Sequence, residues 1–317
     1  MATEAVHAIE VENLTKRYGN LVAVNDITFD VLQGEVFAFL GPNGAGKTTT
    51  VEIVETIRRP TSGKVRLLGM DVTRQKRDIV PRIGVLPQGF NSFDRITVWE
   101  TMQYYSRLFR CRDADIDGLI ELVNLKDKAK EQYMKLSGGL KQRLGIAIAL
   151  VNNPEVVFLD EPTTGLDPRA RREVWEALLG LRKKGKTVFL TTHYIEEAEL
   201  LADTVAIMSK GKIIAMDSPA QLIESNADYL VLTLQSVDAK AFEVVGKMGF
   251  KPELDKDKSI HMRVERADDV RKILNALNDA GAPLLGMDVR KPNLEQVFLK
   301  LTGKALHEGA PGEKGAE

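Results

Sequence analysis

This sequence of 317 residues has one cysteine, no long apolar run and no excess of either charge. The single cysteine, Cys111, excludes an intramolecular disulfide and a metal site built from several cysteines. The longest apolar runs, such as residues 144–151, are far shorter than the roughly 20 residues that cross a bilayer as a helix. We therefore expect a chain that does not cross a membrane by itself.

The beginning of the chain lacks a basic segment followed by an apolar run, so we expect no secretory signal. Lys and Arg total 44 against 45 for Asp and Glu, which gives no overall attraction to nucleic acid or anionic lipid. The hydrophobic fraction of 44% and the charged fraction of 28% are typical of a folded globular protein. The length suggests about two domains.

The order of the sequence patterns indicates an α/β fold. Residues 8–40 contain three short β-branched runs, and from residue 46 onward strand and helix patterns alternate. This alternation is typical of a mainly parallel sheet covered by helices. Between about 97 and 152 only helical patterns occur, which predicts a helical subdomain inserted in the core. Residues 204–218 alternate around a Lys-Gly turn and predict a hairpin.

A second domain is expected after Ser225. Residues 226–303 alternate strand and helix in a short segment, as a ferredoxin-like βαββαβ unit does. The last residues, 304–317, are small and polar without an apolar period, so we expect a disordered tail. The first domain then comprises residues 1–225.

The segment GPNGAGKTT at residues 41–49 fits a phosphate-binding loop between a buried strand and a helix. Its glycines let backbone N–H groups approach phosphate oxygens, and the following helix adds its positive end. Lys47 is placed to reach the β- and γ-phosphates, and Thr48 to offer its hydroxyl to Mg²⁺. The alternative is a plain glycine turn with a solvated lysine, which the strand and helix on either side disfavour.

Two carboxylates end the apolar run VVFLDE at residues 156–161, where such sheets bind their ligands. Asp160 suits the magnesium shell, and Glu161 suits the base that polarises water for attack on the γ-phosphate. Taken alone, an Asp-Glu pair at a strand end is more often a solvated edge. The phosphate loop in the same domain favours the functional interpretation.

A further anion site is possible at LSGG, residues 136–139. Ser137 can cap a helix whose first N–H groups are left bare by Gly138 and Gly139. Considered by itself, the motif is more typical of a simple capped helix.

Six motifs occur in one order: the phosphate loop, Gln88 after IGVLP, LSGG, LDE, GLD at 165–167 and His193 after VFLTT. In this order the chain resembles the nucleotide-binding subunit of ATP-binding cassette (ABC) transporters, from residue 8 to about 225. The resemblance implies a P-loop nucleoside triphosphatase core with an additional antiparallel β subdomain.

The resemblance also implies roles for individual residues. Tyr18 would stack on adenine, Gln88 would contact magnesium and the attacking water, and His193 would bind the γ-phosphate and orient that water. Asp167 would join two subunits, and the LSGG of one subunit would cover the ATP of the other. ATP would thus be bound by Tyr18, Gly41, Pro42, Asn43, Gly44, Ala45, Gly46, Lys47, Thr48, Thr49, Ser137, Gly138, Gly139 and Asp167, and the metal by Thr48, Gln88 and Asp160. Taken singly, Tyr18, Gln88 and His193 are also common as packing or turn residues.

The family implication is a head-to-tail homodimer around two ATP molecules and Mg²⁺, bound to a separate integral membrane permease. The subunit would lie on the cytoplasmic face of the cell membrane, bind no nucleic acid and leave the transported substrate to the permease. One departure is visible, because Leu140 follows LSGG where the family usually has Gln. Ser137, Gly138 and Gly139 would be the phosphate contacts, so we expect capture of the γ-phosphate to survive this change. Leu140 would affect the fine geometry and the ATP affinity of the closed dimer.

The terminal segment KPNLEQVFLKLTG at residues 291–303, together with DEPTTGLDP at 160–168, resembles cassettes of daunorubicin-type drug-resistance exporters. The terminal segment is also a plain amphipathic helix, with Leu294, Val297, Phe298 and Leu301 on one face. We expect an exporter ATPase; an importer ATPase, a soluble cassette ATPase and a non-hydrolysing nucleotide sensor are the alternatives.

Aromatic residues are only 6% of the chain but gather after Gln88, at the start of the predicted helical subdomain. They either form the core of that subdomain or anchor a helix of the membrane partner. These residues are Phe90, Phe93, Trp99, Tyr104 and Tyr105.

Overall fold

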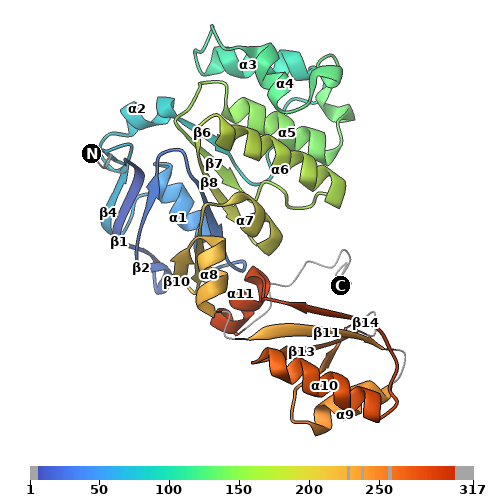
Figure 1. Ribbon diagram of the computed structural model, residues 1–317. Helices are drawn as coiled ribbons and strands as arrows, with labels where there is room; N and C mark the ends of the chain where they lie inside the picture. The colour runs from blue at the N-terminus through green and yellow to red at the C-terminus, as the bar shows by residue number, and fades with distance from the viewer. Residues whose placement is uncertain (1–5, 227–228, 237–238, 256–258, 304–317) are drawn as a thin grey trace, which may run out of the picture. The chain divides into compact units, whose positions relative to one another are not determined.

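The computed structural model describes residues 6–226, 229–236, 239–255 and 259–303 (Figure 1). The segment predicted to be a disordered tail, 304–317, lies outside these residues. Contacts along the chain divide it into two compact units, the first running to Pro219 and the second starting at Ala220. Each unit is described by itself.

The first unit contains an antiparallel sheet of four strands in the order β2-β1-β4-β5. These strands are β1 (His7–Tyr18), β2 (Leu21–Leu32), β4 (Ser62–Leu67) and β5 (Met70–Asp71). Strands β1 and β2 were expected from residues 8–40. Strand β4 was not predicted, because most of its residues are exposed and give no clear apolar pattern. The sheet is the antiparallel β subdomain that the family resemblance implies.

The second sheet of this unit has six strands in the order β10-β9-β3-β8-β7-β6. Strands β3, β6, β7, β8 and β9 are parallel, and β10 adds to β9 as an antiparallel edge. The prediction of a mainly parallel sheet and of a hairpin at 204–218 is confirmed. Their bounds are β3 (Val36–Leu40), β6 (Ile83–Leu86), β7 (Val156–Asp160), β8 (Thr187–Thr192), β9 (Thr204–Ser209) and β10 (Lys212–Asp217).

Both faces of the parallel strands are buried, which explains their continuous apolar runs. On one face, Phe37, Phe39, Phe158 and Phe189 pack with the antiparallel sheet and α1 (Lys47–Val54) in a single core. Phe29 of β2 stacks on Phe37 with 5.4 Å between ring centroids. Because side chains alternate along a strand, the residues between these point to the opposite face.

Further helices of the first unit lie between its strands along the chain. They are α2 (Lys76–Ile79), α3 (Val98–Leu108), α4 (Ile116–Leu122), α5 (Gly138–Ala149), α6 (Pro168–Lys183) and α7 (Ile195–Leu201). Helices α3, α4 and α5 lie between β6 and β7, in the segment of about 97–152 where only helices were predicted. Thr97 and Glu100 cap α3 reciprocally, which fixes where it begins.

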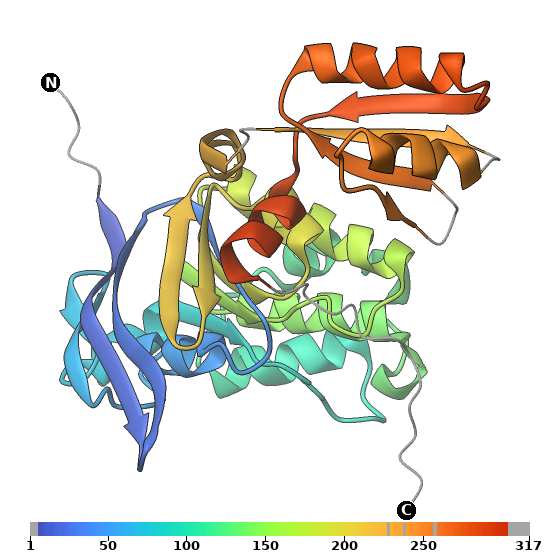
Figure 2. The same ribbon diagram turned by 90° about the horizontal axis from the view of Figure 1, so that it is seen from below.

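The second unit contains a small sheet in the order β12-β13-β11-β14, with every neighbouring pair antiparallel. Its core joins alternate residues of β11 and β13 to α9 and α10, which lie beside the sheet (Figure 2, orange). The elements are α8 (Pro219–Asn226), β11 (Leu230–Ser236), α9 (Ala239–Lys247), β12 (Glu253–Leu254), β13 (Ser259–Val264), α10 (Ala267–Asp279), β14 (Leu284–Arg290) and α11 (Leu294–Thr302). A small C-terminal α/β domain is therefore present, as predicted.

Within the described ranges, no helix has both the length and the apolar character needed to span a membrane.

Candidate nucleotide site

Four segments of the first unit meet at one edge of the six-stranded sheet. Strands β3, β8, β7 and β6 are neighbours in that order and run parallel, so their carboxyl ends lie side by side. The phosphate loop follows β3, His193 follows β8, Asp160 and Glu161 end β7, and Gln88 follows β6. Ligands of such sheets bind at this edge.

The phosphate loop requires glycine at Gly41 and Gly46 because of close backbone neighbours. A Cβ atom on Gly41 would lie 2.4 Å from the carbonyl oxygen of Met208, and one on Gly46 would lie 2.5 Å from that of Ala23. Gly46 also has φ +105°, which L side chains rarely adopt. The loop ends where α1 begins, so free N–H groups of the helix point toward the loop.

Lys47 is 4% exposed and holds its ammonium group over the phosphate loop. Its Nζ donates hydrogen bonds to the carbonyl oxygens of Gly41 (2.7 Å) and Pro42 (3.2 Å) and lies 3.6 Å from Oε1 of Glu161. Burial lowers the pKa of Lys47, and the charge of Glu161 opposes this shift. A cation held in this way is a ready partner for phosphate oxygens.

Asp160 is a buried carboxylate between two hydroxyl groups. The Thr48 hydroxyl donates to its Oδ1 at 3.4 Å, and the Thr191 hydroxyl donates to the same oxygen. Burial raises the pKa of Asp160, the hydrogen bond from Thr191 opposes this, and the neighbouring charge of Glu161 adds to it. A divalent cation next to Asp160 and Thr48 would stabilise the ionised form, and their oxygen donors are those that Mg²⁺ prefers.

Glu161 is the centre of the polar contacts at this edge. Its Oε2 accepts hydrogen bonds from the Gln88 amide (3.2 Å) and the Thr164 hydroxyl (3.1 Å). His193 Nδ1 lies 3.2 Å from the same oxygen but is not aligned for a hydrogen bond in this structure. The contact with His193 lowers the pKa of Glu161, burial opposes the shift, and Lys47 lowers it further. Glu161 is therefore ionised at neutral pH.

The backbone of Glu161 is also unusual. Its φ is +49°, in the left-handed region that a non-glycine residue enters at a cost of roughly 1 kcal/mol. Its N–H donates to the backbone oxygen and to the hydroxyl of Thr191, both at 3.1 Å. Two hydrogen bonds from the neighbouring strand thus hold this backbone conformation and aim the carboxylate toward Lys47.

Three polar partners at this edge are not revealed by the sequence patterns. Thr164 and Thr191 hold the carboxylates of Glu161 and Asp160, and the only sequence signal is the hydroxyl pairs in DEPTT and LTTH. Glu55 follows α1 and is 6% exposed; burial, and next the charge of Asp160, raise its pKa to about 8. The sequence signal for Glu55 is its position as an acidic residue within the mainly apolar run VEIVETI.

The remaining predicted ATP contacts lie on other elements. Ser137 caps α5 and accepts from Leu140 N at 3.4 Å, and Asp167 caps α6 by accepting from Arg169 N and Ala170 N. Helix α5 contacts α6 and β6, whereas α1 contacts β2, β4 and β7, so the phosphate loop and the LSGG segment have different neighbours. The assignment of these residues to ATP stays a prediction.

Tyr18 ends β1, and two cations lie over its ring: Lys16 Nζ at 5.0 Å and the Arg58 guanidinium at 5.7 Å from the centroid. The ring is 39% exposed, which leaves area for a stacked base. Contact with adenine likewise stays a prediction.

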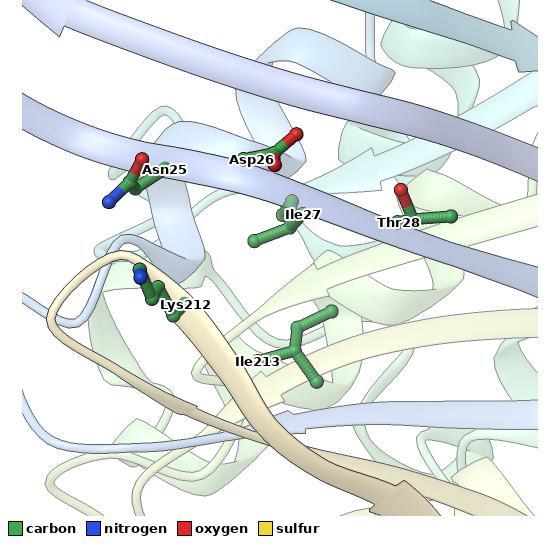
Figure 3. A pocket seen from close by; sticks show the side chains of 6 residues that line it. All are labelled: Asn25, Asp26, Ile27, Thr28, Lys212 and Ile213. Atoms are coloured by element: carbon green, nitrogen blue, oxygen red, sulfur yellow. The ribbon is translucent and has the colours of Figure 1, made fainter.

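A shallow pocket of about 310 Å³ opens between β2 and β10 (Figure 3). It includes no residue of the phosphate loop and no predicted site residue, so we assign it no function. It is lined by Asn25, Asp26, Ile27, Thr28, Lys212 and Ile213.

A phosphate loop between a parallel strand and a helix, with an Asp-Glu pair two strands away, defines a P-loop nucleoside triphosphatase. Comparison with known proteins narrows this class. The sequence model of the family described as "ABC transporter" matches residues 24–164. The chain belongs to the ATP-binding cassette transporter family.

Two similar proteins carry an export ATP-binding protein's name. The Nod factor export ATP-binding protein I of Paraburkholderia xenovorans is 38% identical, over 95% of this chain and 99% of the relative. The protein of the same name from Rhizobium johnstonii is 37% identical, over 94% and 96%. The chain is accordingly the ATP-binding subunit of an ABC exporter and hydrolyses ATP to energise transport.

Solved structures agree with this fold. The structure of cbiO1 from Clostridium perfringens, part of the ABC transporter complex cbiONQ, has a TM-score of 0.62 and 25% identity, covering 77% of this chain and 96% of that chain. The ATP-binding cassette MJ1267 in its ADP conformation has a TM-score of 0.61 and 22% identity, covering 68% and 92%.

Proposed function

We propose that Lys47, Thr48, Gln88, Asp160, Glu161 and His193 form the site of ATP hydrolysis. The observation that carries this proposal is the ionised Glu161 carboxylate, within 3.6 Å of Lys47 and 3.2 Å of both Gln88 and His193. Lys47 binds the β- and γ-phosphates, Glu161 accepts a proton from the attacking water, and His193 and Gln88 orient that water. Purified chain should hydrolyse ATP, and Lys47→Ala should abolish this hydrolysis.

Mg²⁺ fits beside Thr48 and Asp160, with Gln88 as a further ligand, because hydroxyl, carboxylate and amide oxygens are its usual protein ligands. When bound, the metal neutralises charge on the β- and γ-phosphates. Thr191 fixes the Asp160 carboxylate by hydrogen bonding, so this chain holds the acidic ligand in one orientation.

The active species in this proposal is a head-to-tail homodimer. Tyr18 and the phosphate loop of one subunit bind ATP, and Ser137, Gly138 and Gly139 of the other subunit cover it, with Asp167 at the subunit contact. The exposure of Ser137 and Gly138 at the beginning of α5 supports this arrangement, because the N–H groups there face solvent. Leu140 donates its N–H to Ser137 and leaves the cap in place despite the departure from Gln.

The partner in this proposal is a separate membrane permease, which carries the substrate pathway, and the subunit binds it at the cytoplasmic face of the membrane. The transported substrate is an amphiphile, a lipid or a glycan. The relatives named for Nod factor export support an exporter, and the terminal segment 291–303 resembles the daunorubicin-type branch. Co-purification of the permease with this chain tests the assignment.

The second unit is proposed to be ferredoxin-like, with its domain boundary near residue 225. The spatial order β14-β11-β13-β12 in a fully antiparallel sheet, with α9 and α10 in the crossovers, supports the βαββαβ arrangement. Every residue assigned above to ATP lies before this boundary.

A chain ending at Asn226, the last residue of α8, is therefore expected to fold and to bind ATP, with its turnover altered less than tenfold. Circular dichroism and binding of a fluorescent ATP analogue would measure this. The full-length chain and its Lys47→Ala variant are the positive and negative controls. A folded truncated chain without nucleotide binding would show that residues beyond Asn226 complete the ATP site.

Two aromatic residues after Gln88 are expected to anchor the permease. Phe93 is 51% exposed and Trp99 is 38% exposed, so neither forms the core of the helical segment. Phe93 packs edge-to-face on Tyr104 at 5.0 Å, which presents an aromatic surface to a partner helix. Phe93→Ala and Trp99→Ala should each weaken permease binding by ~2 to 4 kcal/mol and leave the isolated ATPase folded and active.

Binding of each variant to the purified permease, together with its melting temperature and ATPase rate, would measure this effect. Leu21→Ala is the control, because Leu21 is 65% exposed at the start of β2, in the antiparallel sheet and outside the helical segment. If both aromatic variants bind the permease as tightly as wild type does, this surface does not bind the permease. A melting temperature that falls as it does for a core variant would instead support the core interpretation.

A further inference from the structure

Glu197 is a fully buried carboxylate that the proposed chemistry does not use. It lies on α7, four residues after His193, and is 0% exposed. Its Oε1 accepts hydrogen bonds from the Thr163 hydroxyl at 2.9 Å and from the Trp175 indole N–H at 3.1 Å. One oxygen atom thus joins three separate segments.

Those three segments are the ones that carry catalytic and subunit-contact residues. Thr163 lies between Glu161 and Asp167, in the loop after β7. Trp175 lies on α6, whose first turn is capped by Asp167. Helix α7 begins directly after His193 and Tyr194. Glu197 therefore links the segment of His193 to the loop from Glu161 to Asp167 and to the helix α6 that follows this loop.

A second contact also joins α6 to the segment of His193. The guanidinium of Arg171, on α6, lies 4.0 Å from the ring centroid of Tyr194, a cation–π distance. The Tyr194 ring in turn lies 4.2 Å from the ring of its neighbour His193. Arg171 also faces Glu197 as a positive charge. Helix α6 thus contacts the His193 segment at two points.

Stability alone does not account for a carboxylate in this place. Burial raises the pKa of Glu197, and the side chains of Thr192, Thr163 and Trp175, in that order, oppose the shift without removing it. Oε2 makes no aligned hydrogen bond among the described residues. An apolar side chain of similar size would avoid the cost of burying this group, so its benefit is expected in the geometry that it imposes.

We propose that Glu197 is a positioning residue for ATP hydrolysis, which holds the His193 segment in register with the loop between Glu161 and Asp167. His193 and Glu161 then reach the same water and phosphate together, and a change at Asp167 reaches His193 through Thr163 and α6. The inference depends on the roles proposed above for Glu161, His193 and Asp167.

The test uses the full chain and steady-state ATP hydrolysis. Glu197→Ala, which removes the hydrogen bonds from Thr163 and Trp175, should lower kcat at least tenfold, and Thr163→Val, which removes only the first, about tenfold. Both should leave KM for ATP within about twofold, since no nucleotide contact changes. Glu197→Gln should retain most of kcat, because its amide oxygen still accepts from Thr163 and Trp175. Thr163→Val keeps the shape of the side chain and serves if Glu197→Ala does not fold.

The decisive readout is a double-mutant cycle with His193→Ala. If Glu197 acts through His193, Glu197→Ala and Thr163→Val should lower kcat by less than about twofold in the His193→Ala background. A full tenfold loss in that background, or unchanged kcat in the single variants, would overturn the inference. Loss of activity in Glu197→Gln equal to that in Glu197→Ala would also overturn it. An unaltered chain without hydrolysis would instead contradict the proposed function itself.

Discussion

Replacement of Glu161 by Gln is expected to slow ATP hydrolysis by about 10² to 10⁴ while ATP binding is retained. The reason is geometric: Gln keeps the shape of the side chain and can still contact Gln88 and Thr164 but cannot accept a proton from water. The loss corresponds to about 3 to 5.5 kcal/mol of activation free energy. Single-turnover hydrolysis and equilibrium ATP binding would separate the two effects.

Glu55→Gln is the matched control, because Glu55 is a second buried glutamate near Asp160. Its pKa of about 8 means that its carboxyl is mostly neutral at pH 7, so an amide changes little there. Glu55→Gln should therefore keep turnover within about threefold of wild type. Near-normal turnover in Glu161→Gln would exclude Glu161 as the base, and an equal loss in both variants would point to general damage around Asp160.

The phosphate loop, Asp160, Glu161 and His193 could be placed from sequence because each follows an apolar strand. Strands of a parallel sheet end at one edge, so a motif at each strand end predicts a shared site. The contacts that orient these groups could not be placed in this way. Thr191 reaches Asp160 and Thr163 reaches Glu197 across neighbouring elements, and no spacing along the chain encodes such pairs.

The strands and the surface were likewise predictable from sequence only in part. Strands β3, β7 and β8 are buried on both faces and give apolar runs, whereas β4 is exposed over half its length and gives no clear pattern. The exposure of Phe93 and Trp99 depends on what packs over them, so aromatic content alone could not distinguish core from surface. Local signals predict elements, and tertiary packing decides which side chains remain outside.

A mixture of Lys47→Ala and Ser137→Arg subunits is expected to recover ATP hydrolysis that neither variant has alone. Lys47 is buried in the phosphate loop, whereas Ser137 is exposed at the start of α5 and has different neighbours. If Ser137 covers the ATP of the other subunit, each mixed dimer contains one site in which Lys47 and Ser137 are both intact. Random mixing makes about half of the dimers mixed, so activity should reach at most about a quarter of wild type.

Lys47→Ala mixed with Glu161→Gln is the matched control. These two residues contact each other within one chain, at 3.6 Å, so every site of that mixed dimer lacks one of them. The control mixture should remain inactive, whereas the Lys47→Ala and Ser137→Arg mixture should not. Two different affinity tags, purified in sequence, would isolate the mixed dimers. Isolated mixed dimers of Lys47→Ala and Ser137→Arg without activity would show that Ser137 does not serve the ATP of the partner, and the head-to-tail arrangement would then be wrong.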